Sequence, residues 1–312
     1  MTSAILAPTI ALNSYLSSTF IPTLPLPLTA VLHAARVSLA YRAIRARVRA
    51  TYGARVEGNE AKDGWILDIA GFLVMSWGGS FLTSYLSGNI PLQLLSVAPL
   101  LTYVGVHFYL TILLSYIPVS AVWLDTLMPL IDGATRTMAV VGGVTLARTN
   151  MNPLAAQSLL FQIILGTIGA CGGGQLAGTL NVFNPDLVGW SFSTPPILKS
   201  RNLLEAIDVI AAVLGSLTFS IFTGSHPAWT PLLARAGLVD PSKYTRKIFH
   251  WSDAEGKAAT TLVIAACFAY RALLTHWSTL APKSVGQRVE IEQKKEKKGV
   301  KSAAIGGGKG AK

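Results

Sequence analysis

The sequence predicts an all-α integral membrane protein with seven transmembrane helices, and three observations lead to this prediction. First, 51% of the residues are hydrophobic, only 13% are charged, and the mean hydropathy is +0.47, whereas a soluble domain carries about 25% charged residues. Second, the apolar residues gather in seven runs that are long enough to cross a bilayer as helices. Third, most of the basic excess is concentrated in two blocks of the chain.

The seven apolar runs lie at about residues 24–42, 64–88, 92–117, 120–147, 155–181, 203–224 and 258–279. The first run is the least regular, because Pro22, Pro25 and Pro27 crowd its start. It also contains His33 and Arg36, so its alternative is a segment that lies in the membrane interface without crossing.

The two basic blocks set the expected orientation. The tail from Lys283 to Lys312 holds nine Lys and Arg against three Glu, a net charge of +6, and Arg42 to Lys62 holds six against two, a net charge of +4. Basic segments that flank membrane helices face the cytosol. Runs two to seven place an even number of crossings between the blocks, so residues 1–23 are expected on the lumenal or external side.

The chain therefore divides into an N-terminal non-cytosolic segment (1–23), a seven-helix domain (24–280) and a basic cytosolic tail (281–312) that is disordered by composition. Neither basic block has the aromatic interleaving of a nucleic-acid groove, so no nucleic-acid partner is expected. The connection 225–257 carries five Lys and Arg against three acidic residues, which leaves its side of the membrane open. Its prolines predict an irregular loop with a short interfacial helix.

The fourth run places ionisable residues inside an apolar segment. An Asp or Arg at the centre of a spanning helix costs about 2.5 to 3.5 kcal/mol, so such residues face a bundle interior, a water path or lipid head groups. Asp132 and Arg136 stand four residues apart and share a helix face. Three interpretations stay open: a structural ion pair, a pore-facing pair in which Asp132 attracts cations and Arg136 limits them, and a lipid-phosphate contact by Arg136. Asp125 extends this polar stripe by two turns.

Two glycine clusters suggest an internal repeat. Sliding the sequence by 94 residues lays Gly78 and Gly79 over Gly172 and Gly173. A repeat of three spans has odd parity, so its second copy is inverted, and inverted repeats place a shared site near the bilayer midplane where helices contain Gly or Pro. The alternative is that these small residues only allow close helix packing. The candidate pore residues are Thr135, Gly78, Gly79, Gly172, Gly173 and Gly174, together with Asp132 and Arg136.

Enzymatic chemistry finds no support in the motifs. The five histidines lack metal-ligand spacing, and neither a Gly-x-Ser-x-Gly nor a Walker pattern occurs. Asp132-Gly133 begins like a lipid-head-group phosphotransferase motif, but no further aspartate follows before Asp186. We therefore expect no enzyme, metal or cofactor. Cys171 and Cys267 both lie in apolar runs, and we expect inert buried thiols.

One segment resembles a known family. Thr135-Arg136-Thr137, followed by Val141-Gly142-Gly143-Val144-Thr145, is similar to the signature segment of the trimeric intracellular cation channels, the TRIC family. The glycine clusters of runs two and five occur in the family's order. The resemblance covers about Leu28 to Leu280, and we expect Gly142 and Gly143 to serve helix packing.

The resemblance implies a protomer of two inverted three-helix repeats plus a seventh helix, assembled as a homotrimer with one cation pathway per protomer. It also implies residence in the endoplasmic reticulum, with the N-terminus lumenal and the C-terminus cytosolic. The implied function is a potassium-permeable monovalent-cation channel that supplies counter-ion current during calcium release. A secondary transporter with inverted repeats is the alternative.

The chain departs from the family at the lipid contact. In the family a lysine and an arginine one turn apart bind an anionic phosphoinositide such as phosphatidylinositol bisphosphate. The arginine corresponds to Arg136, but Asp132 stands at the lysine position and Gly133 replaces the following glutamate. A phosphate site that loses a cation and gains an anion binds phosphate more weakly. We therefore expect Arg136 to bind the lipid more weakly than the corresponding arginine of the family.

Overall fold

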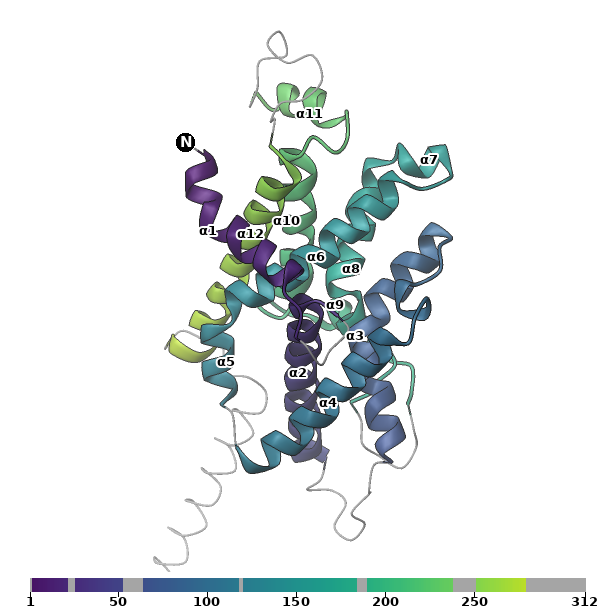
Figure 1. Cartoon of the computed structure of the whole chain (residues 1–312), viewed down its shortest axis with the longest axis vertical. Coiled ribbons are helices and arrows are strands. Elements are labelled where there is room, and N and C mark those ends of the chain that lie inside the picture. Colours follow the sequence, from purple (N-terminus) through teal and green to yellow (C-terminus); the bar gives the residue numbers. More distant parts are fainter. Residues whose placement is uncertain are drawn as a thin grey trace, which may run out of the picture.

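The computed structural model describes residues 2–21, 26–52, 64–117, 120–183, 190–237 and 251–278. Within these ranges every regular element is a helix, and the one β-type pairing is an isolated bridge between Phe20 and Pro27. Figure 1 shows long helices packed side by side and joined by short ones. The all-α prediction is therefore confirmed for the described residues.

All seven predicted runs contain a helix. In chain order the helices are α1 (Thr2–Ser18), α2 (Leu28–Tyr52), α3 (Trp65–Ser87), α4 (Ala98–Tyr116), α5 (Ala121–Leu127), α6 (Pro129–Arg148), α7 (Pro153–Ala156), α8 (Leu159–Thr179), α9 (Pro196–Lys199), α10 (Ile207–Phe222), α11 (Trp229–Arg235) and α12 (Asp253–Ala272). A 3₁₀ turn η2 (Leu92–Leu94) precedes α4, and a π-helical turn η4 (Leu273–Trp277) continues α12.

Four of the described helices are long and apolar enough to cross a membrane: α3, α4, α8, and α12 taken together with η4. The chain is thus a helical protein with membrane-spanning character. Helix α10 is apolar but has only 16 residues. The helices α2 and α6 are not among the four, and they carry the arginines and the aspartate that interrupt their apolar character.

The fourth predicted run is not one helix. It divides at Met128 into the short α5 and the longer α6, whereas the hydropathy of the sequence predicted a single span over 120–147. The cause is Pro129, which has no N–H group to donate and whose ring disfavours helical geometry at the residue before it. Met128 accordingly leaves the helical region, with φ −99° and ψ 4°. The division gives Asp125 and Asp132 to separate helices.

The N-terminal segment forms a helix that hydropathy alone did not predict. Helix α1 packs against α12, and Figure 1 shows it crossing that helix near the N-terminus of the chain. The amide nitrogen of Asn13 donates to Thr261 Oγ1 on α12 at 3.1 Å, and Thr261 Oγ1 donates to Thr137 Oγ1 on α6 at 3.1 Å. These buried hydrogen bonds connect α6 with α1 and α12, the first and last of the described α-helices.

The long helices form two packed groups. Helices α2, α3 and α4 share a hydrophobic core around Tyr41, Phe72 and Tyr103, whereas α6, α10 and α12 share a second core around Val144 and Phe219. Helix α8 packs against α6 and α10 on one side and against α3 on the other. The contact between α3 and α8 therefore joins the two groups.

Glycines allow that contact to be close. A Cβ atom at Gly79 would lie 2.7 Å from the carbonyl oxygen of Ile168, and one at Gly172 would lie 3.0 Å from the Cα of Gly79. A Cβ at Gly173 would overlap the carbonyl group of Met75, and one at Gly78 would lie 3.2 Å from the Cα of Gly173. The two glycine clusters that the 94-residue offset aligns thus pack against each other.

The glycines of the signature segment behave differently from one another. A Cβ at Gly143 would overlap the backbone of Leu165 on α8, so this glycine allows α6 and α8 to approach. A Cβ at Gly142 would meet nothing within 4 Å, and the residue is exposed. Within one chain, only Gly143 of the pair acts in packing.

The other predicted regions lie partly outside the described residues. The connection 225–257 contains the short helix α11, as its composition predicted, while residues 238–250 fall outside. The basic tail 281–312 lies entirely outside. Both cysteines are free thiols; Cys171 is buried and Cys267 is half-buried.

Candidate functional site

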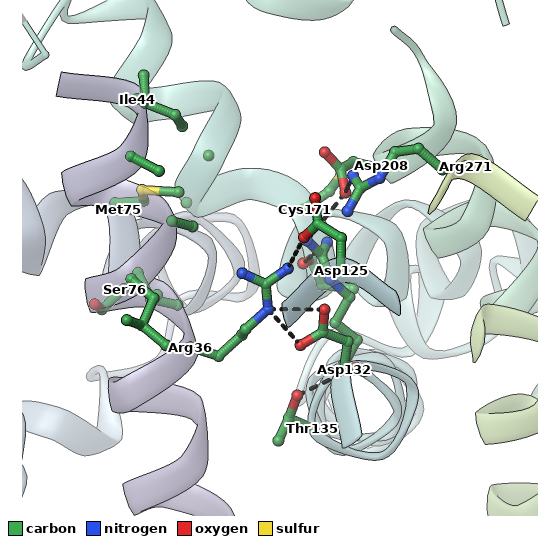
Figure 2. A pocket seen from close by; sticks show the side chains of 18 of the residues that line it. Arg36, Ile44, Met75, Ser76, Asp125, Asp132, Thr135, Cys171, Asp208 and Arg271 are labelled. Atoms are coloured by element: carbon green, nitrogen blue, oxygen red, sulfur yellow. Dashed lines mark hydrogen bonds and ion pairs between the residues drawn. The ribbon is translucent and has the colours of Figure 1, made fainter. Parts of the chain in front are cut away.

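A cavity of about 460 Å³ lies between the two helix groups. Its walls come from α2 and α3 on one side and from α5, α6, α8, α10 and α12 on the other. Figure 2 shows ionisable side chains from several of these helices converging on it. The ionisable residues of the wall are His33, Arg36, Arg47, Asp125, Asp132, Arg136, Cys171, Glu205, Asp208, Arg271 and His276.

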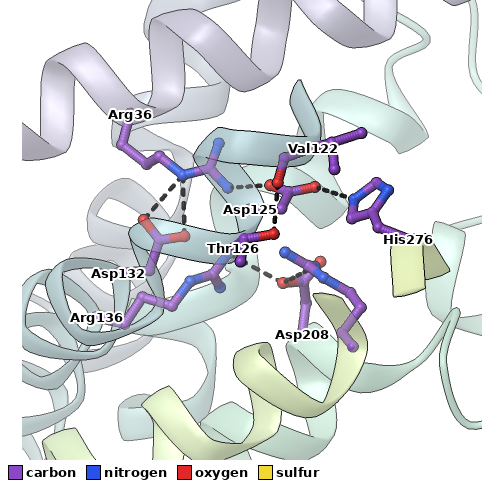
Figure 3. A network of polar contacts seen from close by, with 9 residues as sticks. Arg36, Val122, Asp125, Thr126, Asp132, Arg136, Asp208 and His276 are labelled. Carbon is purple, nitrogen blue, oxygen red and sulfur yellow. Dashed lines mark hydrogen bonds and ion pairs between the residues drawn. The ribbon is translucent and has the colours of Figure 1, made fainter. Parts of the chain in front are cut away.

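Three of these side chains form a cluster that we call the acidic triplet: Arg36, Asp125 and Asp132. Arg36 reaches across from α2, and its Nε donates to both carboxylate oxygens of Asp132 on α6 at 2.9 Å. Its terminal nitrogen donates to Asp125 Oδ1 on α5 at 2.8 Å. Figure 3 shows the guanidinium between the two carboxylates. Counting only these three side chains, the formal charge is −1.

A second cluster, the basic triplet, comprises Arg136, Asp208 and Arg271. Arg136 on α6 and Arg271 on α12 both donate to Asp208 Oδ1 on α10, at 3.0 and 3.3 Å. Both guanidinium groups also lie over the ring of Phe268, at 4.7 and 4.9 Å from its centroid, within the range of a cation–π contact. The formal charge of these three side chains is +1.

Asp132 and Arg136 bond to other helices. The sequence offered an ion pair between them at i and i+4 as one interpretation, but Asp132 bonds to Arg36 and Arg136 bonds to Asp208. The carboxylate of Asp132 is thereby committed to α2, and Arg136 is committed to α10 and to the carbonyl oxygen of Ala170 on α8. Both residues thus form ion pairs, but with partners on other helices and not with each other.

The two triplets give the cavity an internal polarity without a net charge. Their six side chains sum to zero, but the carboxylates and arginines are unevenly distributed between the two clusters. The side chain of Asp208 is 40% exposed and that of Asp125 is 24% exposed, so both keep contact with the cavity. Partly desolvated charges in such a space act more strongly on an ion than they would in water. Chemically, the arrangement can attract a cation at one cluster and an anionic group at the other.

The remaining predicted residues fall into two sets. Thr135, Gly79, Gly173 and Gly174 line the cavity together with Asp132 and Arg136, whereas Gly78 and Gly172 do not. Thr135 donates its hydroxyl hydrogen to the backbone carbonyl of Asp132 at 3.1 Å. A Cβ at Gly174 would meet nothing within 4 Å, so this glycine borders open space. The sequence thus brings six of its eight candidate pore residues to one cavity.

Sequence reasoning did not assign Arg36, Asp208, Arg271 and His276 to the site. Each is a single ionisable residue inside or beside an apolar run, with no neighbouring charged residue in the sequence that would indicate its partner. The structure pairs Arg271 with Asp208, and it pairs Asp68 on α3 with Arg45 and His107. The available signal was charge balance, since unpaired charges are costly inside a membrane and each Arg in a span implies a nearby acid.

A separate polar cluster lies inside the first helix group. Ser38 Oγ lies 2.7 Å from His107 Nδ1, and His107 Nε2 lies 3.1 Å from Asp68 Oδ2. These residue types match a hydrolase triad, but the serine contacts Nδ1 and the aspartate contacts Nε2, the reverse of the triad arrangement. Ser38 has no exposed surface and does not line the cavity. The cluster is therefore a packing feature that joins α2, α3 and α4.

Among the described residues no group of three or more His, Cys, Asp or Glu side chains could hold a metal ion. Comparisons of the chain with protein-family models, with curated proteins and with solved structures gave no match. The fold and the cavity thus define the class of protein: a helical membrane protein with a cavity lined by charged residues between two helix groups.

Proposed function

We propose that this protein is a monovalent-cation channel whose pathway runs through the cavity between the two helix groups. The observation that carries the proposal is the cavity wall, where the acidic triplet and the basic triplet face a common space among apolar helices. Charged residues at this depth mark ion or substrate pathways. The resemblance of the α6 segment to the signature of the TRIC family supports the same assignment.

Several further features belong to the proposal. Seven helices act as spans, one from each predicted apolar run: α2, α3, α4, α6, α8, α10 and α12. In this arrangement α2 to α4 and the group of α6, α8 and α10 are inverted copies, and α12 is the added seventh helix. The packing of the two aligned glycine clusters against each other supports this relation, because symmetric repeats meet at their axis. We further propose a homotrimer in the endoplasmic reticulum that carries potassium as counter-ion during calcium release.

A secondary transporter is the second candidate, and one observation favours it. In each triplet every charged group contacts an oppositely charged one, which is the arrangement of a closed site that must rearrange before an ion passes. Flux distinguishes the two mechanisms, because a channel gives resolved current steps and a carrier gives slow, saturable uptake.

The deciding experiment is a recording of the purified full-length protein in a planar bilayer with a potassium chloride gradient. A channel gives unitary currents whose reversal potential lies toward the potassium equilibrium potential. Folded, homogeneous preparations that give no cation-selective steps but take up potassium slowly would favour the carrier. Preparations that do neither would reject the proposal.

The role of Arg136 is tested in the same recordings. Arg136→Ala leaves Asp208 with Arg271 as its arginine partner, so we expect an altered conductance or open probability with an unchanged oligomeric state on size-exclusion chromatography.

Addition of a phosphatidylinositol bisphosphate tests the lipid contact. The Arg136 guanidinium already donates to Asp208 and to the Ala170 carbonyl oxygen, so we expect the lipid to change the currents only weakly. A strong effect that Arg136→Ala abolishes would instead support a lipid site at Arg136 like that of the family.

A further inference from the structure

Helix α5 contributes Leu124 and Asp125 to the cavity wall, although little hydrophobic packing holds this helix. It has only seven residues, and it contacts mainly α12 and α6. No side chain from 122 to 127 is buried, and Trp123 and Leu127 are more than half exposed. Elements with few buried apolar contacts open at low free-energy cost. The contacts that hold α5 in place are therefore mainly polar and aromatic.

Most of these attachments come from the π-helical turn η4 at the end of α12. Trp277 Nε1 donates to Thr126 Oγ1 at 3.0 Å, and the rings of Trp123 and Trp277 meet edge to face with centroids 6.0 Å apart. His276 Nε2 lies 3.1 Å from Asp125 Oδ2. Short π-helical turns are rare and occur frequently at functional sites. Here the turn directs two consecutive side chains to one short helix.

Asp125 connects this attachment to the cavity. One of its carboxylate oxygens meets His276 of η4, and the other accepts from Arg36 of α2. Figure 3 shows the continuous line from His276 through Asp125 and Arg36 to Asp132. Displacement of α5 would withdraw one of the two carboxylates that hold Arg36, so the position of α5 determines how firmly Arg36 is fixed in the cavity wall.

We propose that α5 is a movable lid on the cavity and that η4 is the latch that holds it closed, with Trp277 and His276 as positioning residues. Closing brings Asp125 to Arg36 and completes the acidic triplet. Release moves α5 from the cavity mouth and leaves Arg36 paired with Asp132 alone. The lid rests on the proposed function only in that the cavity it covers is taken as the ion pathway.

The two native cysteines report on the lid without any measurement of current. Cys171 lines the cavity and is 8% exposed, whereas Cys267 lies on α12 and does not line it. A small methanethiosulfonate reagent is added to the full-length protein in liposomes, and mass spectrometry follows the labelling of each cysteine with time. The rate at Cys171 measures opening of the cavity, and the rate at Cys267 measures general loosening of the helices.

Two variants remove the same hydrogen bond from opposite sides. Trp277→Phe keeps the aromatic ring but loses the N–H donor, and Thr126→Val loses the acceptor. Loss of one hydrogen bond shifts the equilibrium between closed and open α5 by about fivefold. In each variant we therefore expect the reagent to label Cys171 about fivefold faster than in the wild type and Cys267 at the wild-type rate. The double variant adds little to either single change. The matched control is Trp65→Phe, since Trp65 is 73% exposed at the start of α3 and remote from the latch along the chain.

The outcomes separate the lid from the channel. Unchanged Cys171 labelling in both latch variants, or equal acceleration at both cysteines, would overturn the lid even if currents are present. Faster labelling confined to Cys171 in a protein that passes no potassium would support the lid and reject the channel. Faster labelling together with a higher open probability in the same variants would support both.

Discussion

Arg36 joins three helices at the level of single side chains, because it extends from α2 to a carboxylate on α5 and another on α6. Its side chain is 19% exposed and that of Asp132 is 10% exposed, so neither charge is freely hydrated. Hydrophobic patterning could assign both residues to apolar runs of the sequence but could not pair them. The pairing depends on how α2 packs against α6, and spacing along one helix contains no information on that contact.

Replacement of Arg36 by Gln tests the energetic side of this pairing. Removing one member of a buried ion pair leaves the other charge uncompensated, and it costs about 3 kcal/mol or somewhat less where water retains access. We therefore expect Arg36→Gln to lower the thermal midpoint in detergent. The double variant Arg36→Gln with Asp132→Asn should recover part of this loss, because it removes the stranded carboxylate as well.

A non-interacting pair would give a different result, since two independent changes would add their losses. Arg201→Gln serves as the control for loss of one arginine, because Arg201 is exposed and donates to Glu205 through its backbone N–H group. Its thermal midpoint is expected to stay at the wild-type value.

Asp208 offers the corresponding test of ion selectivity. Asp208→Asn leaves Arg136 and Arg271 over the same ring without their shared carboxylate, so the basic triplet changes its formal charge from +1 to +2. An extra positive charge in the cavity wall repels cations. In a potassium chloride gradient the reversal potential should move toward zero, and a move toward the potassium equilibrium potential would contradict the placement of Asp208 beside the pathway.

At the scale of helices, the contact between α3 and α8 was predictable in kind but not in detail. The glycine clusters in runs two and five indicated either a pore or close packing, and the structure places them at a contact whose edge borders the cavity. The sequence could not show which glycines face the neighbouring backbone. That division follows from the rotation of each helix about its axis, as the contrast between Gly142 and Gly143 shows.

Gly79→Ala and Gly105→Ala form a matched pair for this contact. A methyl group at Gly79 would lie within 2.8 Å of two backbone carbonyl oxygens of α8, so the helices must separate, at a cost of about 1 to 3 kcal/mol. A methyl group at Gly105 on α4 would meet nothing within 4 Å, and Ala favours a helix over Gly by about 1 kcal/mol. Thermal unfolding in detergent should therefore show a loss for Gly79→Ala and no loss for Gly105→Ala. Equal changes in thermal midpoint at both positions would contradict the assignment of Gly79 to a close α3–α8 contact.

For the whole molecule, composition and hydropathy were sufficient to predict a helical membrane protein and the approximate positions of seven helices. They were insufficient for α1 and for the division between α5 and α6. Helix α1 contains Pro8, a residue that favours the end of a helix, yet it continues to Ser18 and packs against α12. Pro129 was visible in the sequence, but a proline at the first turn of a helix and a proline inside a kinked one look alike without coordinates.

The arrangement of the chain ends makes a prediction for the intact molecule. Figure 1 shows the N-terminus in the upper part of the view and the end of α12, beside α5, well below it. Basic segments stay on the cytosolic side, so protease added to sealed microsomes should remove a tag placed after Lys312. A tag placed before Met1 should be protected, because seven crossings put it on the opposite side. Removal of both tags would mean that the protein crosses an even number of times and that one helix does not span.

The hydrogen bonds from Asn13 through Thr261 to Thr137 have a consequence for biosynthesis. The ribosome releases α1 and α6 long before α12, so Asn13 and Thr137 are synthesised before the threonine that joins them. Asp208 likewise gains its second arginine only when α12 emerges. Among the described helices the last to be translated therefore completes polar contacts of the first, and a nascent chain cut short before α12 would leave the side chains of Asn13 and Thr137 without the threonine that joins them.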